Sequence, residues 1–115
     1  MSLLDTSMVI KHLQEKTPHT GHISILTLIE ILRGIPIEKR VDIKKSFEEL
    51  YRIYHLDNEI INEYCRLYDT LKQEGKLIPE TDIIIAATAI AKKITLATLD
   101  THFTRLEKYG LKIET

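Results

Sequence analysis

The stretch PETDIIIAATAIAKKITLATLD, at residues 79–100, decides the fold of this chain. Its proline, a threonine that can cap, and a long run of isoleucine and alanine predict a buried helix over residues 81–91. The β-rich run at 94–98 predicts the buried strand that follows. Asp82 lies in the first turn of this helix, and Asp100 lies just past the carboxyl end of the strand, where open α/β sheets bind their ligands. We therefore expect both aspartates at one edge of a sheet.

The composition is that of a globular protein. The 115 residues suit one domain, residues 1–115, and 43% of them are hydrophobic and 29% charged. No apolar run approaches the ~20 residues that cross a bilayer, so we expect no membrane contact and a cytoplasmic location. With 16 basic and 17 acidic residues, the net charge of -1 argues against binding nucleic acid by bulk charge alone. The single cysteine, Cys65, is expected to be a small buried hydrophobe.

The rest of the chain alternates predicted strands with predicted helices. This alternation predicts an α/β fold of three layers, α/β/α, with a central parallel sheet of about five strands and right-handed connections. Thr6 or Ser7 is expected to cap the first helix, and Gly34 to end the second. The predicted strands outside the opening stretch are 2–5, 22–25, 53–56 and 110–113, and the predicted helices are 6–16, 26–32, 37–51, 57–75 and 101–108.

Four carboxylates are expected to meet at the carboxyl edge of this sheet. Asp5 and Asp100 directly follow predicted strands, and the helices that carry Glu30 and Asp82 begin at the same edge. Carboxylates at close range raise one another's pKa, and few basic residues adjoin these positions, so a divalent cation is the economical explanation. Oxygen ligands alone select a hard ion, which predicts Mg²⁺ or Mn²⁺. Such ions support the in-line hydrolysis of a phosphodiester.

Each carboxylate also has a purely structural interpretation. Asp82 can act as a cap or as a partner of the helix dipole, and Asp5 and Asp100 can cap the helices that follow them. Glu30 can pair with Arg33 one turn further along its helix. Taken singly these interpretations are favoured, and they weaken only because the four positions fall together at one sheet edge.

Neighbouring polar residues carry the same ambiguity. Thr6, Ser7 and Thr98 can orient the carboxylates, or they can reflect helix capping and strand propensity. His102 can touch a substrate phosphate, but we interpret it as a surface histidine.

Four segments together resemble the PIN-domain nucleases, and specifically the VapC-type toxins of prokaryotic toxin-antitoxin pairs. They cover nearly the whole chain in the order that the family shows, and they are LLDTS at 3–7, SILTLIEILRG at 24–34, DIIIAATA at 82–89 and ATLDTHF at 97–103. The resemblance implies an RNA endonuclease whose Mg²⁺ or Mn²⁺ is bound by the acidic residues Asp5, Glu30, Asp82 and Asp100. Leu99 departs from the family, because relatives often have a polar or basic residue at this position. The departure argues against a substrate contact by residue 99, and it leaves the metal site unaffected.

The resemblance also implies partners. These are an RNA substrate, a cognate VapB-type antitoxin whose C-terminal segment lies across the active groove, and a second copy of the toxin in a homodimer. The apolar, tyrosine-bearing helices within residues 41–68 are candidates for a partner groove, or they are ordinary core. The basic cluster Lys39, Arg40, Lys44 and Lys45 can help to hold RNA, or it is a solvated helix face.

Three other functions stay open at this point. One is a PIN-domain nuclease of RNA processing or decay that has no antitoxin. Another is a PIN fold kept only to bind RNA or protein, which the intact acidic residues disfavour. From a different class, a phosphoacceptor receiver domain also gathers carboxylates at a sheet edge, but its early pair of adjacent acids and its late lysine have no match here.

Overall fold

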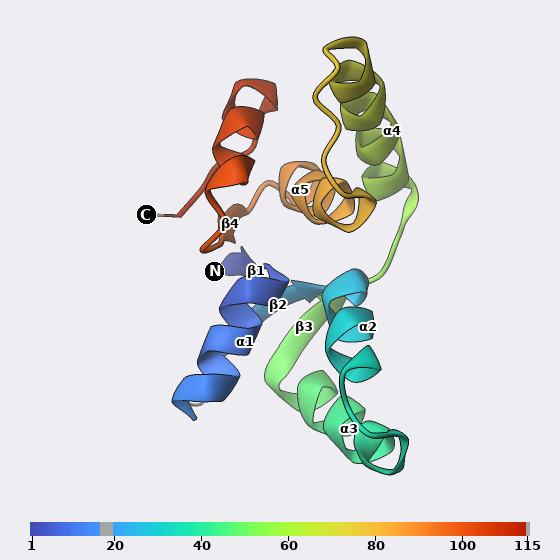
Figure 1. The fold of residues 1–115 in the computed structure, drawn as a ribbon, viewed down its shortest axis with the longest axis vertical. Helices are drawn as coiled ribbons and strands as arrows, with labels where there is room; N and C mark the ends of the chain where they lie inside the picture. Colours follow the sequence, from blue (N-terminus) through green and yellow to red (C-terminus); the bar gives the residue numbers. More distant parts are fainter. Residues whose placement is uncertain (17–19, 115) are drawn as a thin grey trace.

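The computed structural model describes residues 1–16 and 20–114, and this part of the chain forms a four-stranded parallel sheet between two layers of helices (Figure 1). The strands lie in the order β3-β2-β1-β4. Their bounds are β1 Ser2–Leu4, β2 Gly21–Ser24, β3 Tyr51–Tyr54 and β4 Thr95–Ala97. The chain adds β2 and β3 on one side of β1 and then returns to add β4 on the other. The gap between β1 and β4 is therefore the point at which the strand order reverses, and ligands of open α/β sheets bind at such points.

Helices cover both faces of the sheet, as predicted. In Figure 1 one layer lies below the sheet and the other above it. The lower layer contains α1 (Thr6–Glu15), α2 (Ile25–Arg33), the short η1 (Ile37–Lys39) and α3 (Arg40–Leu50). The upper layer contains α4 (Asn58–Gln73), α5 (Glu80–Lys92) and the 3₁₀ helix η2 (Thr101–Tyr109).

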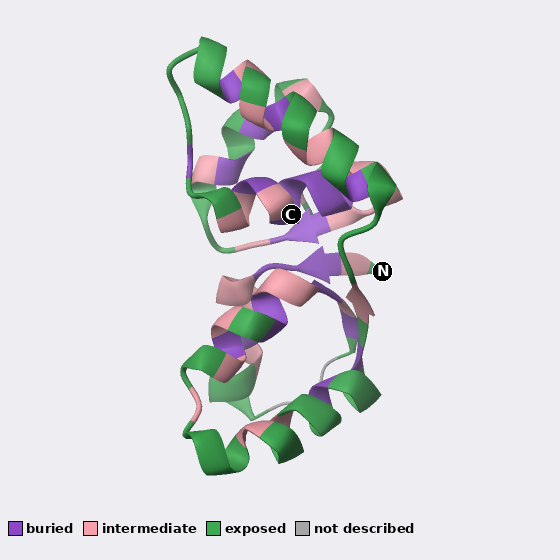
Figure 2. Ribbon diagram, turned by 90° about the vertical axis from the view of Figure 1, so that its right-hand side faces the viewer, coloured by how far each residue is buried: buried purple, intermediate pink, exposed green. Residues whose placement is uncertain are grey.

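The core has two parts, one on each face of the sheet. Leu3 and Leu96 pack with α4, α5 and η2, whereas Leu4 and Ala97 pack with the helices of the lower layer. Successive residues of a strand point to opposite faces, so adjacent apolar residues serve both parts of the core. Figure 2 shows the buried residues along the strands and on the inner sides of the helices. This burial on both faces is why adjacent residues of the central strand β1 and its neighbour β4 are apolar, whereas β2 and β3 also carry the polar residues His22 and Arg52.

The predicted helix and strand of the opening stretch are both present. The helix α5 begins at Glu80 after the N-cap residue Pro79, so Thr81 is not its cap. Three alanines in its middle, at 86, 87 and 89, are buried. Small side chains let α5 pack closely against α4, and this is the largest contact between two helices in the described structure. The first turn of α5, with Asp82, is thereby fixed at the carboxyl edge of the sheet.

Two predicted strands differ from the structure. The strand expected at 110–113 forms only an isolated bridge between Ile113 and Leu96, so the sheet of the described residues has four strands instead of about five. The strand β3 begins at Tyr51, two residues before the predicted start, because Tyr51 already pairs with Gly21 of β2. Its buried ring also packs on Phe47, with a centroid distance of 5.3 Å.

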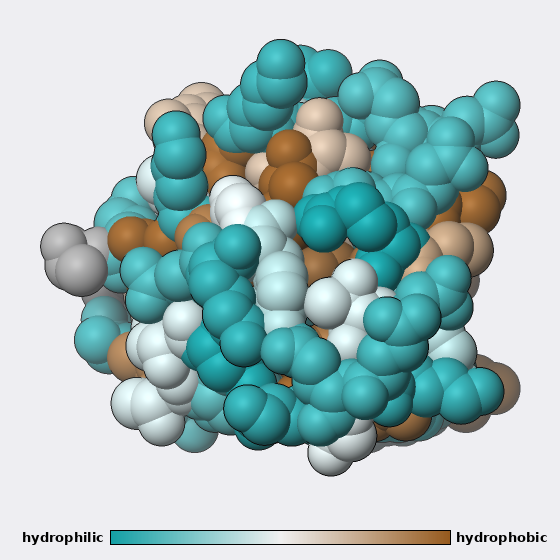
Figure 3. Space-filling model, turned by 90° about the horizontal axis from the view of Figure 1, so that it is seen from above, coloured by the Kyte–Doolittle hydropathy of each residue, from teal (hydrophilic) through white to brown (hydrophobic). Residues whose placement is uncertain are grey.

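The prediction for Cys65 is wrong, because this residue is exposed. The buried stripe of α4 consists of Ile60, Leu67 and Leu71, and Cys65 lies off that stripe on the outer side of the helix. In the described part of the chain, none of the helices is long and apolar enough to cross a membrane. From above, Figure 3 shows a mainly hydrophilic surface with small hydrophobic areas between the polar side chains.

Candidate active site

Asp5 is a buried carboxylate at the carboxyl end of β1, with 4% of the residue exposed. Its Oδ1 accepts hydrogen bonds from the Met8 N–H at 2.9 Å and from the Ser7 hydroxyl at 2.6 Å. Its Oδ2 accepts from the Thr98 hydroxyl, which follows β4. The cap of α1 is therefore Asp5, and not Thr6 or Ser7 as predicted. Buried carboxylates need such donors, and here they fix the orientation of the Asp5 side chain.

Glu30 reaches the same edge from α2. This helix starts directly after β2, where the hydroxyl of the buried Ser24 accepts from the Leu26 N–H at 3.1 Å and caps the helix. Glu30 lies in the second turn, and its Oε1 accepts from the Thr6 hydroxyl at 2.7 Å. The Thr6 oxygen is also 3.2 Å from the Thr27 hydroxyl. Thr6 thus joins the first turn of α1 to the carboxylate on α2.

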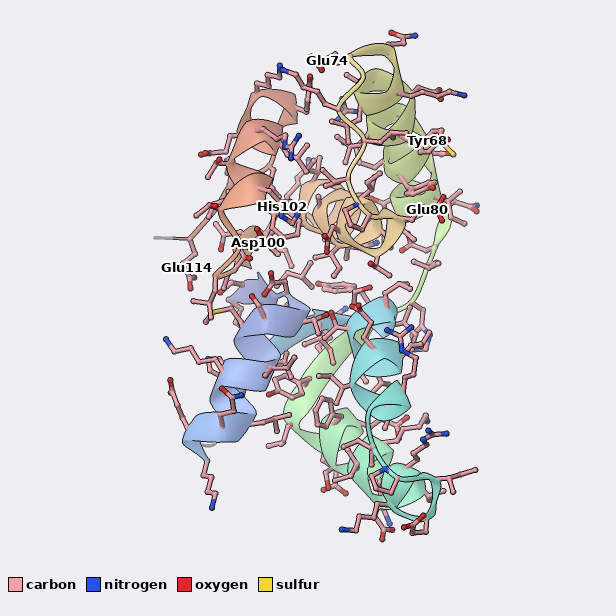
Figure 4. All side chains as sticks on the ribbon, viewed as in Figure 1. Tyr68, Glu74, Glu80, Asp100, His102 and Glu114 are labelled. Atoms are coloured by element: carbon pink, nitrogen blue, oxygen red, sulfur yellow. The ribbon has the colours of Figure 1, made fainter. Side chains whose placement is uncertain are left out.

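Asp82 and Asp100 meet at one side chain, His102. The His102 Nε2 lies 3.2 Å from Asp82 Oδ2, and its Nδ1 lies 2.5 Å from Asp100 Oδ1. Asp100 also caps η2 by accepting the His102 backbone N–H at 3.1 Å. Figure 4 shows Asp100 and His102 next to each other on the side of η2 that faces α5. The interpretation of His102 as a surface histidine is therefore wrong, since 26% of its side chain is exposed and both ring nitrogens contact carboxylates.

Thr98 connects the two ends of the site. Besides donating to Asp5, its hydroxyl oxygen accepts from the Asp100 N–H at 2.9 Å. The Leu99 N–H donates to the Ser7 hydroxyl at 3.2 Å. These bonds tie the segment after β4 to the segment after β1, across the point where the strand order reverses. The structure thus places all three predicted orienting hydroxyls on site carboxylates: Ser7 and Thr98 on Asp5, and Thr6 on Glu30.

The charges of the site are coupled. Burial raises the pKa of Asp82 above its ordinary value, and the carboxylates of Asp100 and Glu30 raise it further. The His102 ring acts in the opposite direction and lowers the pKa of Asp82. A positive charge beside Asp82 is therefore favourable, because it offsets both burial and the neighbouring negative charges.

The donor set suits a hard divalent cation in its chemistry. Glu30, Asp82 and Asp100 interact electrostatically, and Asp5 is joined to Asp100 through Thr98, so carboxylate oxygens from four elements lie at this edge. Within residues 1–16 and 20–114, however, no group of three or more His, Cys, Asp or Glu side chains is already arranged to hold a metal ion. The side chains instead hold hydroxyls and the His102 ring.

The chain belongs to the PIN domain family. The family model for the PIN domain matches residues 2–109, which confirms the resemblance seen in the sequence. The chain is also similar to the protein named Ribonuclease VapC1 of Methanocaldococcus jannaschii. The two are 39% identical over 115 residues, and the match covers 96% of this chain and 85% of that relative.

Solved structures share the same fold. VapBC-1 from nontypeable Haemophilus influenzae matches with a TM-score of 0.83 at 20% identity, over 98% of this chain and 96% of the other. VapBC2 from Rickettsia felis, bound to a DNA fragment from the promoter, matches with a TM-score of 0.79 at 22% identity and the same coverage. At these identities the likeness concerns the fold, and it confirms the predicted PIN-like α/β architecture.

Proposed function

We propose that this chain is a metal-dependent endoribonuclease that hydrolyses RNA phosphodiester bonds and acts as the toxin of a VapBC-type toxin-antitoxin pair. The observation that carries the proposal is the linked set of aspartates at the carboxyl edge of a PIN-family sheet: His102 contacts both Asp82 and Asp100, and Thr98 joins Asp100 to Asp5. The 39% identity to a VapC ribonuclease supports the same activity. A cluster of carboxylates in which one pKa is raised by burial and by its neighbours is typical of an active site.

In this proposal three aspartates are the chief ligands of Mg²⁺ or Mn²⁺, namely Asp5, Asp82 and Asp100. When bound, such an ion would activate water and neutralise charge on the phosphate. Glu30 helps to bind the ion or orients the attacking water, and the Thr6 hydroxyl holds its carboxylate in place. The Asp5 carboxylate is preorganised by its hydroxyl and N–H donors, so it does not reorient when substrate binds.

Contacts to RNA are expected mainly at the carboxylate edge. In the predicted basic cluster, the Lys44 ammonium lies 3.0 Å from the Glu48 carboxylate, which offsets its charge, and the Arg40 Nε is engaged by the Ile35 carbonyl at 2.8 Å. With a net charge of -1, the protein relies on a bound cation more than on a basic surface to meet the phosphate.

Protein partners complete the proposal: a VapB-type antitoxin and a second copy of the chain. An apolar pocket of about 240 Å³ lies between α4 and α5 and is lined by Leu56, Ile60, Ile61, Tyr64 and Ile84. Three of these residues fall within the helices that the sequence marked as candidates for a partner groove. Ile84 and Asp82 are two residues apart on α5, so they face different sides of this helix, and the pocket lies on another side of α5 from the carboxylate that contacts His102. We place the activity in the cytoplasm, with the RNA.

The activity is tested with purified protein, a single-stranded RNA of mixed sequence, and either Mg²⁺, Mn²⁺ or EDTA. Losing a residue that only supports a metal ligand costs about 10- to 100-fold in affinity or activity, so Asp100→Asn, which removes a ligand, should lose at least that much. The matched control is Asp69→Asn, the same change at an exposed residue of α4, and it should cleave like the wild type. Cleavage that persists in EDTA, or equally in Asp100→Asn, would refute the proposed nuclease.

A second experiment separates the toxin from a nuclease of RNA processing. If a small gene lies directly upstream and encodes a DNA-binding protein, its product should copurify with this chain and inhibit the metal-dependent cleavage. Cleavage with no inhibition by any such product would favour the processing nuclease. Light scattering of the purified chain reports whether it is a homodimer.

A further inference from the structure

His102 lies between two carboxylates that the proposed function assigns to the metal. Its Nε2 is 3.2 Å from Asp82 and its Nδ1 is 2.5 Å from Asp100, so the ring contacts both at once. The ring is supported from one side by Phe103, which is 1% exposed, with ring centroids 4.7 Å apart and planes inclined by 25°. The backbone of His102 is also fixed, since its N–H is bound by Asp100.

We propose that His102 is an internal competitor for the cation: its imidazole occupies the space between Asp82 and Asp100, and it must leave at least one of them before an ion binds both. The inference rests on the proposed function, because it assumes that these aspartates bind a metal. It assigns to His102 a positioning role in the metal-free protein and makes it a determinant of metal affinity.

The geometry supports competition and not joint ligation of the ion. Oxygen ligands of Mg²⁺ lie at about 2.0–2.1 Å from the ion, so two carboxylates that share an ion must approach it closely. A ring between the same two carboxylates fills that space. The ring has an N–H donor in either protonation state, so it holds at least one carboxylate whether or not it is charged.

The ring also has a way out of the site. With 26% of the His102 side chain exposed, it can turn toward solvent about its side-chain bonds. The cap at Asp100 and the helix α5 need not change, because the cap uses the His102 backbone and α5 is held by its buried alanines. In the metal-free protein the ring therefore keeps two like charges together, and on binding the cation replaces it.

The test measures Mn²⁺ binding by isothermal titration calorimetry to the wild-type chain, His102→Ala and His102→Gln. Removing a hydrogen-bonded competitor should strengthen Mn²⁺ binding about tenfold in His102→Ala. His102→Gln keeps an N–H donor and should bind with intermediate affinity. The control His55→Ala, at an exposed histidine after β3, should bind Mn²⁺ like the wild type. Circular dichroism checks that each variant is folded.

A spectroscopic measurement on the wild type gives an independent result. As Mg²⁺ is added, the imidazole nitrogen NMR signals of His102 should move toward those of a solvent-exposed ring. The midpoint of this change should fall at the dissociation constant of Mg²⁺. The signals of His55 should not move. This measurement decides the matter even if His102→Ala does not fold.

The outcomes distinguish the two proposals. Equal or weaker Mn²⁺ binding by His102→Ala, with binding intact in the wild type, would overturn the competitor and leave the nuclease proposal standing. Weaker binding would show that His102 supports the ion, either as a ligand or by holding Asp82 and Asp100 together, and does not compete with it. Failure of every variant to bind Mn²⁺ or Mg²⁺ would overturn both.

Discussion

Replacing Thr98 with valine tests whether the hydroxyl network holds the site together. The Thr98 hydroxyl donates to the Asp5 Oδ2 and accepts from the Asp100 N–H at 2.9 Å. Valine keeps the branched shape of threonine and its preference for extended backbone, so the variant removes the hydroxyl and little else. Its effect on stability therefore reports on the two hydrogen bonds.

The expected loss follows from the burial of Asp5. With 4% of this residue exposed, water does not replace the lost donor, and a hydrogen bond to a charged group contributes about 1.5–3 kcal/mol. The hydrogen bond from the Asp100 N–H adds about 0.5–1 kcal/mol. This is the lower part of the usual range for a hydrogen bond between neutral groups, because Asp100 is exposed to water. The sum is about 2–4 kcal/mol. With an unfolding entropy of about 2.1 cal/mol/K per residue for a chain of 115 residues, this lowers the Tm by about 8–17 °C.

Urea unfolding in EDTA, followed by circular dichroism at pH 7, measures this loss. The matched control is Thr70→Val, whose hydroxyl donates to the Arg66 carbonyl within α4 at 2.9 Å, and it should change the free energy of unfolding by about 0.5 kcal/mol or less. The urea m-value should be the same for all three proteins. If Thr98→Val is no more destabilised than Thr70→Val, the hydroxyl does not hold the Asp5 carboxylate, and the network described for this site is wrong.

Two further substitutions should respond to pH in opposite ways. Burial, Asp100 and Glu30 raise the pKa of Asp82, so its ionised form lowers stability. In metal-free protein Asp82→Asn should therefore be more stable than the wild type at pH 7. This gain in stability should vanish as the pH falls through the raised pKa of the folded state to about 3.9, the pKa of aspartate in the unfolded chain. Equal urea midpoints for the two proteins at pH 7 would contradict this. The hydrogen bond from Lys92 lowers the pKa of Asp57, so Asp57 stabilises the fold above about pH 3.9 and this contribution is lost as pH falls through the folded pKa. Asp57→Asn should have a lower Tm than the wild type at pH 7 and the same Tm at the acid limit, and a constant difference across this range would show that charge is not the cause.

The parts of the fold that the sequence predicted well are those with a continuous buried core. The run at residues 79–100 forms α5 and β4 as predicted, because its middle, residues 85–89, and the strand residues Leu96 and Ala97 are buried. Predictions were poorer where a residue depends on a distant partner. Residues 110–113 have the apolar pattern of a strand, yet only Ile113 finds a bridge on Leu96. Local pattern cannot report whether a sheet edge is available to pair.

The same distinction applies to the candidate site. The four acidic positions follow from a rule of topology, since strand ends and helix starts of a parallel sheet share an edge. The contacts between them do not follow from any local pattern. Thr98 lies 93 residues from Asp5, and His102 lies 20 residues from Asp82. The sequence places His102 in the first turn of a helix that Asp100 can cap, and this position indicates that it lies near Asp100. Its contact with Asp82 depends on the packing of η2 beside α5, which no local pattern indicates.

Capping and metal binding are not exclusive roles for these aspartates. A carboxylate has two oxygens with about four acceptor sites, so Asp5 and Asp100 can cap α1 and η2 and still present lone pairs to a cation. Asp82 differs from both, because the cap residue of α5 is Pro79 and the contact that the structure gives the Asp82 carboxylate is with the His102 ring. Asp5 therefore contributes to folding and to the site together, whereas the raised pKa of Asp82 means that its charge costs stability. A charge that costs stability and lies beside two other carboxylates gains most from a bound cation. Asp82→Asn should therefore weaken metal binding without lowering the stability of the fold, whereas a change at Asp5 should lower both.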